Sequence, residues 1–229
     1  GGGNRLSSCS KGFTLAEVLI TLGIIGVVAA MTMPALISGH NKSVVETRLK
    51  RIDSVLNSAL KLAEKDYAEP QNWEAVSSPQ VIKTFFMPYL PGSKFISEAN
   101  LKYYTIYTSD GSSSFLLNGG YSSGFQMKTG EIIKVNGAGL DKEFQIGIIL
   151  KPNKNNKYIS GKDYFVLYMD RTKGVVDVKP WAAHWNVSCN SDRNTVLSQC
   201  KSSSGHSALC TLLIECNGWK IPDDYPIRF

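Results

Sequence analysis

The chain has 229 residues, of which 43% are hydrophobic and 19% are charged. This composition excludes a disordered chain and fits one compact domain with one membrane segment. The formal net charge of +6 is spread along the sequence with no run of five basic residues, so no tract is dedicated to nucleic acid.

Residues 13–37 form the first predicted element, an apolar stretch whose one charged residue is Glu17. As a helix it is long enough to cross a bilayer core of about 30 Å. Arg5 and Lys11 precede it without any negative charge, which predicts that residues 1–12 stay in the cytoplasm and that the rest of the chain is exported. A secretory signal would have its small-residue cleavage site after the apolar stretch, whereas here the stretch runs on into a polar helix. We therefore expect the segment to be retained.

The sequence Lys-Gly-Phe-Thr-Leu-Ala-Glu at residues 11–17 resembles the prepilin cleavage and methylation motif of type IV pilins and type II secretion pseudopilins. Residues where this family usually has glycine, alanine and proline also match, namely Gly26, Ala30 and Pro34. The resemblance implies cleavage by a prepilin peptidase after Gly12 and methylation of the new amine on Phe13. Because the chain shows no catalytic or cofactor-binding motif, we expect neither enzymatic activity nor a cofactor.

The same resemblance implies partners and a location. The partners are other pilin subunits, the prepilin peptidase, the inner-membrane assembly platform and membrane lipid. The protein is expected as a single-pass inner (cytoplasmic) membrane protein with a cytoplasmic N-terminus, which later joins a periplasmic or cell-surface filament. Two other function classes stay open, a competence-type minor pilin that contacts DNA and a membrane-anchored binding domain.

Glu17 is predicted to act in assembly, because a carboxylate in hydrocarbon is costly and is retained where it gains a partner. The charged amine of Phe13, in the same or a neighbouring subunit, is one helical turn away. The alternative is a plain signal anchor with a chance glutamate. Gly26 and Pro34 weaken the helix, and the resemblance implies a segment that loses helicity in the filament. The alternative is close helix packing through the small residues Gly26 and Ala30.

Residues 38–41 are a polar break, after which residues 38–229 are expected to form the exported head. Apolar residues then recur at helical spacing from Val45 to Ala63, with basic residues that include Arg48 and Arg51 expected mostly on or beside the solvent face. Residues 13–67 are thus predicted to form one long, interrupted helix of about 80 Å.

A second helix is predicted over residues 79–87, with Ser78 as its cap. Strands are then predicted in turn over 101–109, 113–118, 124–128, 131–135, 143–150, 163–169 and 174–179. The predicted fold is α+β and pilin-like, with the long helix packed on an antiparallel sheet.

The loop from Pro152 to Phe165 resembles a pseudopilin loop region near which relatives can bind calcium. Here the loop is rich in lysine and poor in carboxylates, so no metal site is predicted. Asp163 is expected to be a turn or strand-cap residue.

Once Cys9 is assigned to the removed leader, four cysteines remain, all within the last 41 residues: Cys189, Cys200, Cys210 and Cys216. They lack metal-site spacing and predict two disulfides formed outside the cytoplasm. Three pairings are possible. Cys200 with Cys210 is favoured because residues 201–209 can form a closed loop, which leaves Cys189 for Cys216. A short helix is expected over residues 207–216, ending at Asn217-Gly218.

No catalytic residue is predicted. His40, His184 and His206 belong to no catalytic motif, and aromatic residues such as Tyr107 are expected to pack in the core or on a sheet surface.

Overall fold

The structure is a computed structural model that describes residues 12–74, 77–137, 143–171, 179–180, 187–202 and 207–229. The chain divides into two compact units, residues 1–41 and residues 42–229. The first unit holds the N-terminal part of the long helix α1, Leu15–Tyr67, and the second unit, here called the head, holds the rest of α1 and all other elements.

Helix α1 is continuous, so the predicted interruption at residues 38–41 is wrong. None of these four residues is a proline, so each keeps its backbone N–H for the helix. A glycine costs only about 1 kcal/mol relative to alanine in a helix. The turns on both sides of this polar stretch are sufficient to keep it helical.

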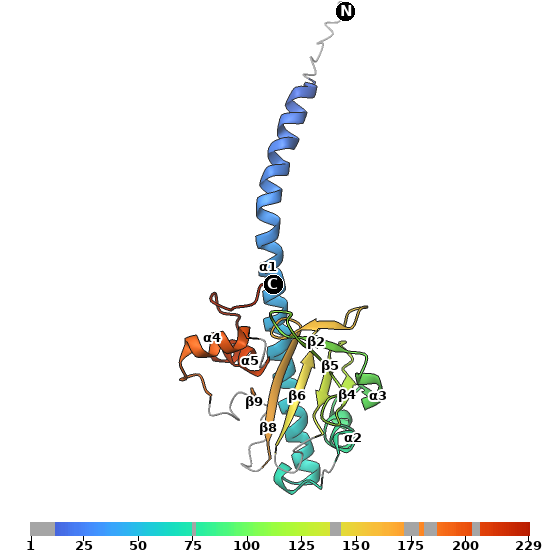
Figure 1. The fold of residues 1–229 in the computed structure, drawn as a ribbon. Helices are drawn as coiled ribbons and strands as arrows, with labels where there is room; N and C mark the ends of the chain where they lie inside the picture. Colours follow the sequence, from blue (N-terminus) through green and yellow to red (C-terminus); the bar gives the residue numbers. More distant parts are fainter. Residues whose placement is uncertain (1–11, 75–76, 138–142, 172–178, 181–186, 203–206) are drawn as a thin grey trace, which may run out of the picture. The chain divides into compact units, whose positions relative to one another are not determined.

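The C-terminal part of α1 packs on a six-stranded antiparallel sheet (Figure 1). Its buried side chains recur every three or four residues, at Leu49, Ile52, Leu56, Ala59, Leu60 and Ala63. Every pairing in the sheet is antiparallel, as predicted. The strand order is β1 (Lys94–Ile96), β4 (Ser123–Gln126), β5 (Ile132–Val135), β6 (Glu143–Ile149), β8 (Tyr164–Asp170) and β9 (Lys179–Pro180).

A second sheet of three strands contains a parallel pair that the sequence did not predict. Its order is β3 (Ser114–Leu116), β2 (Thr105–Tyr107) and β7 (Lys157–Ile159), with β2 antiparallel to β3 and parallel to β7. The strand expected over 101–109 is shortened because helix α3, Glu98–Leu101, precedes it. The rings of Phe115 and Tyr164 are in contact, with centroids 6.0 Å apart, so the small sheet packs against the large one.

The segment after α1 is a series of short helical turns rather than the predicted helix over 79–87. It comprises η1 (Pro70–Asn72), α2 (Ser78–Val81), the π-helical turn η2 (Ile82–Phe86) and the 3₁₀ turn η3 (Met87–Tyr89). Ser78 is not the cap. Its hydroxyl donates to the carbonyl of Val135 and accepts from the amide of Ser123, both at 2.8 Å. These bonds attach α2 to the large sheet.

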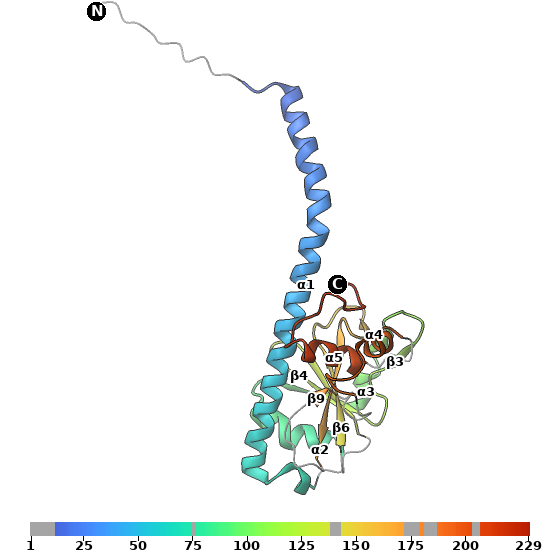
Figure 2. The same ribbon diagram turned by 90° about the vertical axis from the view of Figure 1, so that its left-hand side faces the viewer.

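Two further helices of the head, α4 (Arg193–Lys201) and α5 (Ser207–Cys216), lie side by side (Figures 1 and 2), and α5 packs against β8. The sequence predicted α5 but not α4. The N-cap of α4 is Asp192, whose side chain accepts from the amide of Thr195 at 2.8 Å. The strand expected over 174–179 lies outside the described residues except for Lys179, which begins β9.

Candidate functional site

The N-terminal unit presents an apolar helical surface. Large hydrophobic side chains are exposed along it, and Phe13 is 88% exposed. The helix is long and apolar enough to cross a membrane, and no part of its most apolar window is buried inside the protein. An apolar surface of this extent is typical of a segment that lies in lipid or against other apolar helices.

Thr14 and Glu17 cap the start of helix α1. The Glu17 carboxylate accepts from the Thr14 amide at 2.8 Å and from its hydroxyl at 2.9 Å, and the Glu17 amide donates to the Thr14 hydroxyl oxygen at 3.2 Å. This reciprocal pair is a capping box, which satisfies amide groups left free at the helix start. This role of Thr14 was not predicted, although the spacing Thr-x-x-Glu at residues 14–17 could have indicated it.

Gly12 and Phe13 precede the helix and belong to no helix or strand, and Gly12 is the one described residue of the predicted leader. A Cβ atom added at Gly12 would meet nothing within 4 Å. In the uncleaved chain the Phe13 nitrogen is part of the peptide bond to Gly12, so its charged amine exists only after cleavage. The carboxylate predicted to pair with that amine here caps the helix instead.

Gly26 and Pro34 both lie inside α1, where Pro34 lacks the N–H that would complete the hydrogen-bond ladder. Thr21 and Thr32 donate their hydroxyl protons back to carbonyls of the preceding turn, at 2.9 Å and 3.0 Å, which satisfies polar groups that would otherwise face hydrocarbon.

Two disulfides hold the C-terminal region of the head. Cys200 is bonded to Cys210 and Cys189 to Cys216, which is the pairing favoured from the sequence. The first pair is buried, with 1% and 0% exposure, and it joins α4 to α5. Both cysteines of the second pair are exposed. The two bonds therefore differ in their access to solvent.

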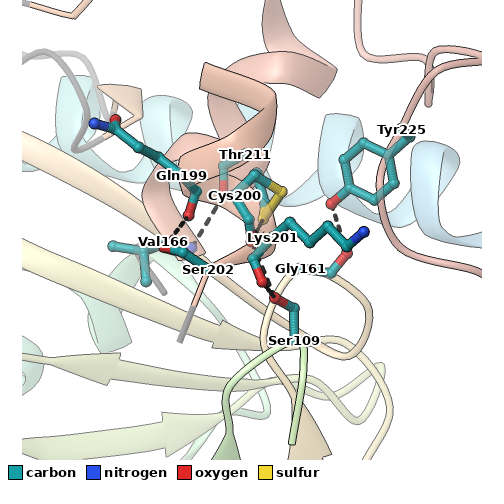
Figure 3. Close-up of a disulfide and its surroundings, with 10 residues drawn as sticks. Ser109, Gly161, Val166, Gln199, Cys200, Lys201, Ser202, Thr211 and Tyr225 are labelled. Atoms are coloured by element: carbon teal, nitrogen blue, oxygen red, sulfur yellow. Dashed lines mark hydrogen bonds between the residues drawn. A yellow bond between two sulfur atoms is a disulfide. The ribbon is translucent and has the colours of Figure 1, made fainter. Parts of the chain in front are cut away.

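Hydrogen bonds connect the buried disulfide to both sheets (Figure 3). The Ser109 hydroxyl, at the end of β2, lies 3.1 Å and 2.9 Å from the carbonyl oxygens of Cys200 and Lys201. The Val166 amide of β8 donates to the Thr211 hydroxyl at 3.2 Å. These contacts fix α4 and α5 relative to the strands.

Arg48 and Arg51 do not simply face solvent, so that part of the helix prediction is corrected. Arg48 donates to the Leu150 carbonyl at 2.6 Å, and Arg51 donates to the Glu131 carboxylate at 2.5 Å. Glu131 is 1% exposed. Each arginine precedes a residue of the buried stripe on α1, Leu49 or Ile52, and its long side chain reaches the sheet from there.

Asp163 is a turn residue, as predicted. Its carboxylate accepts from the Ile159 amide at 3.0 Å, and its own amide donates to the Ile159 carbonyl at 2.8 Å. Among the described residues no group of three His, Cys, Asp or Glu side chains could hold a metal ion. His184 and His206 lie outside the described residues.

The N-terminal motif and the fold define the class. Residues 7–33 match the prokaryotic N-terminal methylation motif, so the chain is a type IV pilin-like or pseudopilin-like substrate of prepilin peptidase. Proteins with this motif are structural subunits that assemble with other pilins.

Residues 35–229 match a family described as a family of unknown function (DUF6613), and the chain belongs to that family. No curated protein matches, and no solved structure matches.

Proposed function

We propose that the protein is a structural subunit of a type IV pilus or of a type II secretion-like pseudopilus. Prepilin peptidase removes residues 1–12 and the Phe13 amine is methylated. Residues 13–37 hold the subunit in the inner membrane, with the N-terminus in the cytoplasm and residues 38–229 outside. The same helix then assembles the subunit into the filament.

The observation that carries this proposal is the exposed apolar surface of α1 directly after the cleavage motif. The only charged side chain on this surface is Glu17. Such a helix is stable in lipid and can move from there into a filament core made of similar helices. Cleavage creates the Phe13 amine one turn from Glu17, which gives the carboxylate a cationic partner. The exposed and the buried disulfide suit a head that folds in an oxidising compartment.

The test is cleavage in cells that also express a prepilin peptidase. We expect the intact mass to fall by the mass of residues 1–12, with one methyl group added at Phe13. Gly12→Val should remain uncleaved, and because a Cβ atom at Gly12 meets nothing within 4 Å, the rest of the fold should be unaffected. Gly3→Val is the matched control and should be processed normally. Equal processing of Gly12→Val and the parent would refute the assignment.

A further inference from the structure

A groove of about 470 Å³ lies on the head. Its walls are the turn after β2 and the residues around β7, and its lining includes Tyr107, Asp110, Lys157, Ile159 and Asp163. Its volume falls in the range of small-molecule binding sites in proteins.

The floor of the groove is the outer face of the three-stranded sheet. Tyr107 lies opposite Ile159 in the parallel pair, while Ile106 and Tyr158 next to them point inward and are at most 1% exposed. Because side chains alternate along a strand, Tyr107, Lys157 and Ile159 share the outer face. The floor therefore offers an aromatic ring and an aliphatic side chain to a ligand.

Two carboxylates at the groove are each held in place through one oxygen. Asp110 Oδ1 accepts from the Thr108 hydroxyl at 2.6 Å and from the Ser112 amide at 3.0 Å, and Asp163 Oδ2 accepts from the Ile159 amide. Within the described part of the chain, nothing donates to Asp110 Oδ2 or to Asp163 Oδ1. Burial raises the pKa of Asp163 above its usual value.

The wall that carries Asp110 is rigidly supported. Ser109 donates to the last carbonyls of α4, next to the buried disulfide (Figure 3). Its neighbours Thr108 and Ser112 close the turn around the carboxylate. A site that is preformed in this way loses little conformational entropy when a ligand binds.

The charges at the groove nearly cancel, which decides the kind of ligand. Among the lining residues, Asp110 and Asp163 contribute two negative charges and Lys157 contributes one positive charge. Lys162, which does not line the groove, adds a positive charge next to Asp163. The balance favours neither a polycation nor an anion. The ligand that complements the groove is therefore a neutral molecule. Its hydroxyl groups would donate to Asp110 Oδ2 and Asp163 Oδ1, and its apolar face would lie on Tyr107.

We propose that this groove binds a neutral saccharide, with its hydroxyl groups donating to Asp110 and Asp163 and its C–H face on Tyr107. This function is separate from filament assembly, which uses α1. A subunit of a surface-exposed or periplasmic filament would carry the site on its exported part.

The test uses the full chain in micelles of a detergent without a sugar headgroup. Maltose, cellobiose and N,N′-diacetylchitobiose are titrated while chemical shifts or saturation transfer are followed by NMR. We expect saturable binding of at least one disaccharide with a dissociation constant of about 1 mM or lower. Spermidine and glucuronic acid serve as a cationic and an anionic competitor and should bind more weakly.

Asp110→Asn keeps the acceptor oxygen that holds the turn but removes the charge, and it should weaken binding about tenfold, as expected for a lost hydrogen bond to a charged group. Tyr107→Ala should weaken it comparably. The matched control is Asp223→Asn, because Asp223 does not line the groove. This variant should bind the disaccharide like the parent. The proposal is overturned if no disaccharide binds, if spermidine or glucuronic acid binds more tightly, or if Asp110→Asn and Tyr107→Ala bind like the parent.

Discussion

The contact between Arg51 of α1 and the buried carboxylate of Glu131 should contribute strongly to the stability of the head. Arg51 Nη2 lies 2.5 Å from Glu131 Oε1, and the Thr129 hydroxyl donates to the other carboxylate oxygen at 2.5 Å. Arg48 Nη1 is more distant from Glu131 Oε1, at 3.9 Å. Replacing Arg51 by methionine keeps most of the aliphatic side chain but leaves Glu131 buried without its main cationic partner.

Removing one partner of a fully buried ion pair costs about 3 to 5 kcal/mol. The Arg51 side chain is 36% exposed, and solvent screens part of the interaction. We therefore expect Arg51→Met to lower the free energy of unfolding by about 2 to 3 kcal/mol, near the value of hydrogen bonds to a charged group. For a domain of this size, 1 kcal/mol corresponds to about 2 to 4 °C in Tm, so Tm should fall by roughly 4 to 12 °C.

The pair should also make stability depend on pH. Burial by itself raises the pKa of Glu131, but hydrogen bonds from Thr129, from the backbone and from Arg51, together with the charge of Arg51, outweigh it and hold the pKa below 4.5. A carboxyl with a lowered pKa stabilises the fold above pH 4.5, and this stabilisation is lost as the pH falls through the lowered value. The stability difference between the parent and Glu131→Gln should therefore shrink below pH 4.5.

The assay is thermal and urea unfolding of the full chain in detergent, followed by circular dichroism. The matched control is Arg193→Met, which removes an exposed ion pair to Asp224 whose N–O distance is 2.6 Å and whose side chains are 49% and 47% exposed. Such pairs contribute about 0 to 1 kcal/mol. If Arg51→Met destabilises the head no more than Arg193→Met does, the reasoning from burial is refuted.

Three further predictions concern assembly, redox chemistry and packing. Glu17→Leu should insert into the membrane but should be poorly incorporated into filaments, as measured in the sheared-filament fraction. Glu17→Gln should behave in the same way, because it can still cap the helix but lacks the charge. Normal filament recovery for either variant would contradict the pairing with the Phe13 amine. A mild thiol reductant followed by alkylation and mass spectrometry should label the exposed Cys189 and Cys216 before Cys210, whose disulfide is buried; equal labelling rates would contradict this prediction. Gly161→Ala should destabilise the head by about 2 to 4 kcal/mol in urea unfolding, because φ is +76° and the new Cβ would lie 2.7 Å from the Cys210 sulfur; an unchanged unfolding midpoint would show that the packing relaxes.

The sequence by itself determined the features that depend on residues close together in the chain. The apolar run, the motif at residues 11–17 and the charges before them are contiguous, and the stripe from Val45 to Ala63 has the period of a helix. Strand segments such as 131–135 were also recognisable, because their apolar content and their flanking turns are local.

Only the tertiary structure decided which distant residues meet. Arg51 and Glu131 are 80 positions apart, and Ser78 turned from a predicted cap into a link to β4 and β5 because the sheet supplied stronger partners. The parallel pairing of β2 with β7, and with it the groove, depends on a long chain return that no local pattern encodes. Four cysteines allow three pairings, and the length of the loop between Cys200 and Cys210 favoured the observed one. The tertiary structure shows how it forms, because α4 lies beside α5, which packs against β8.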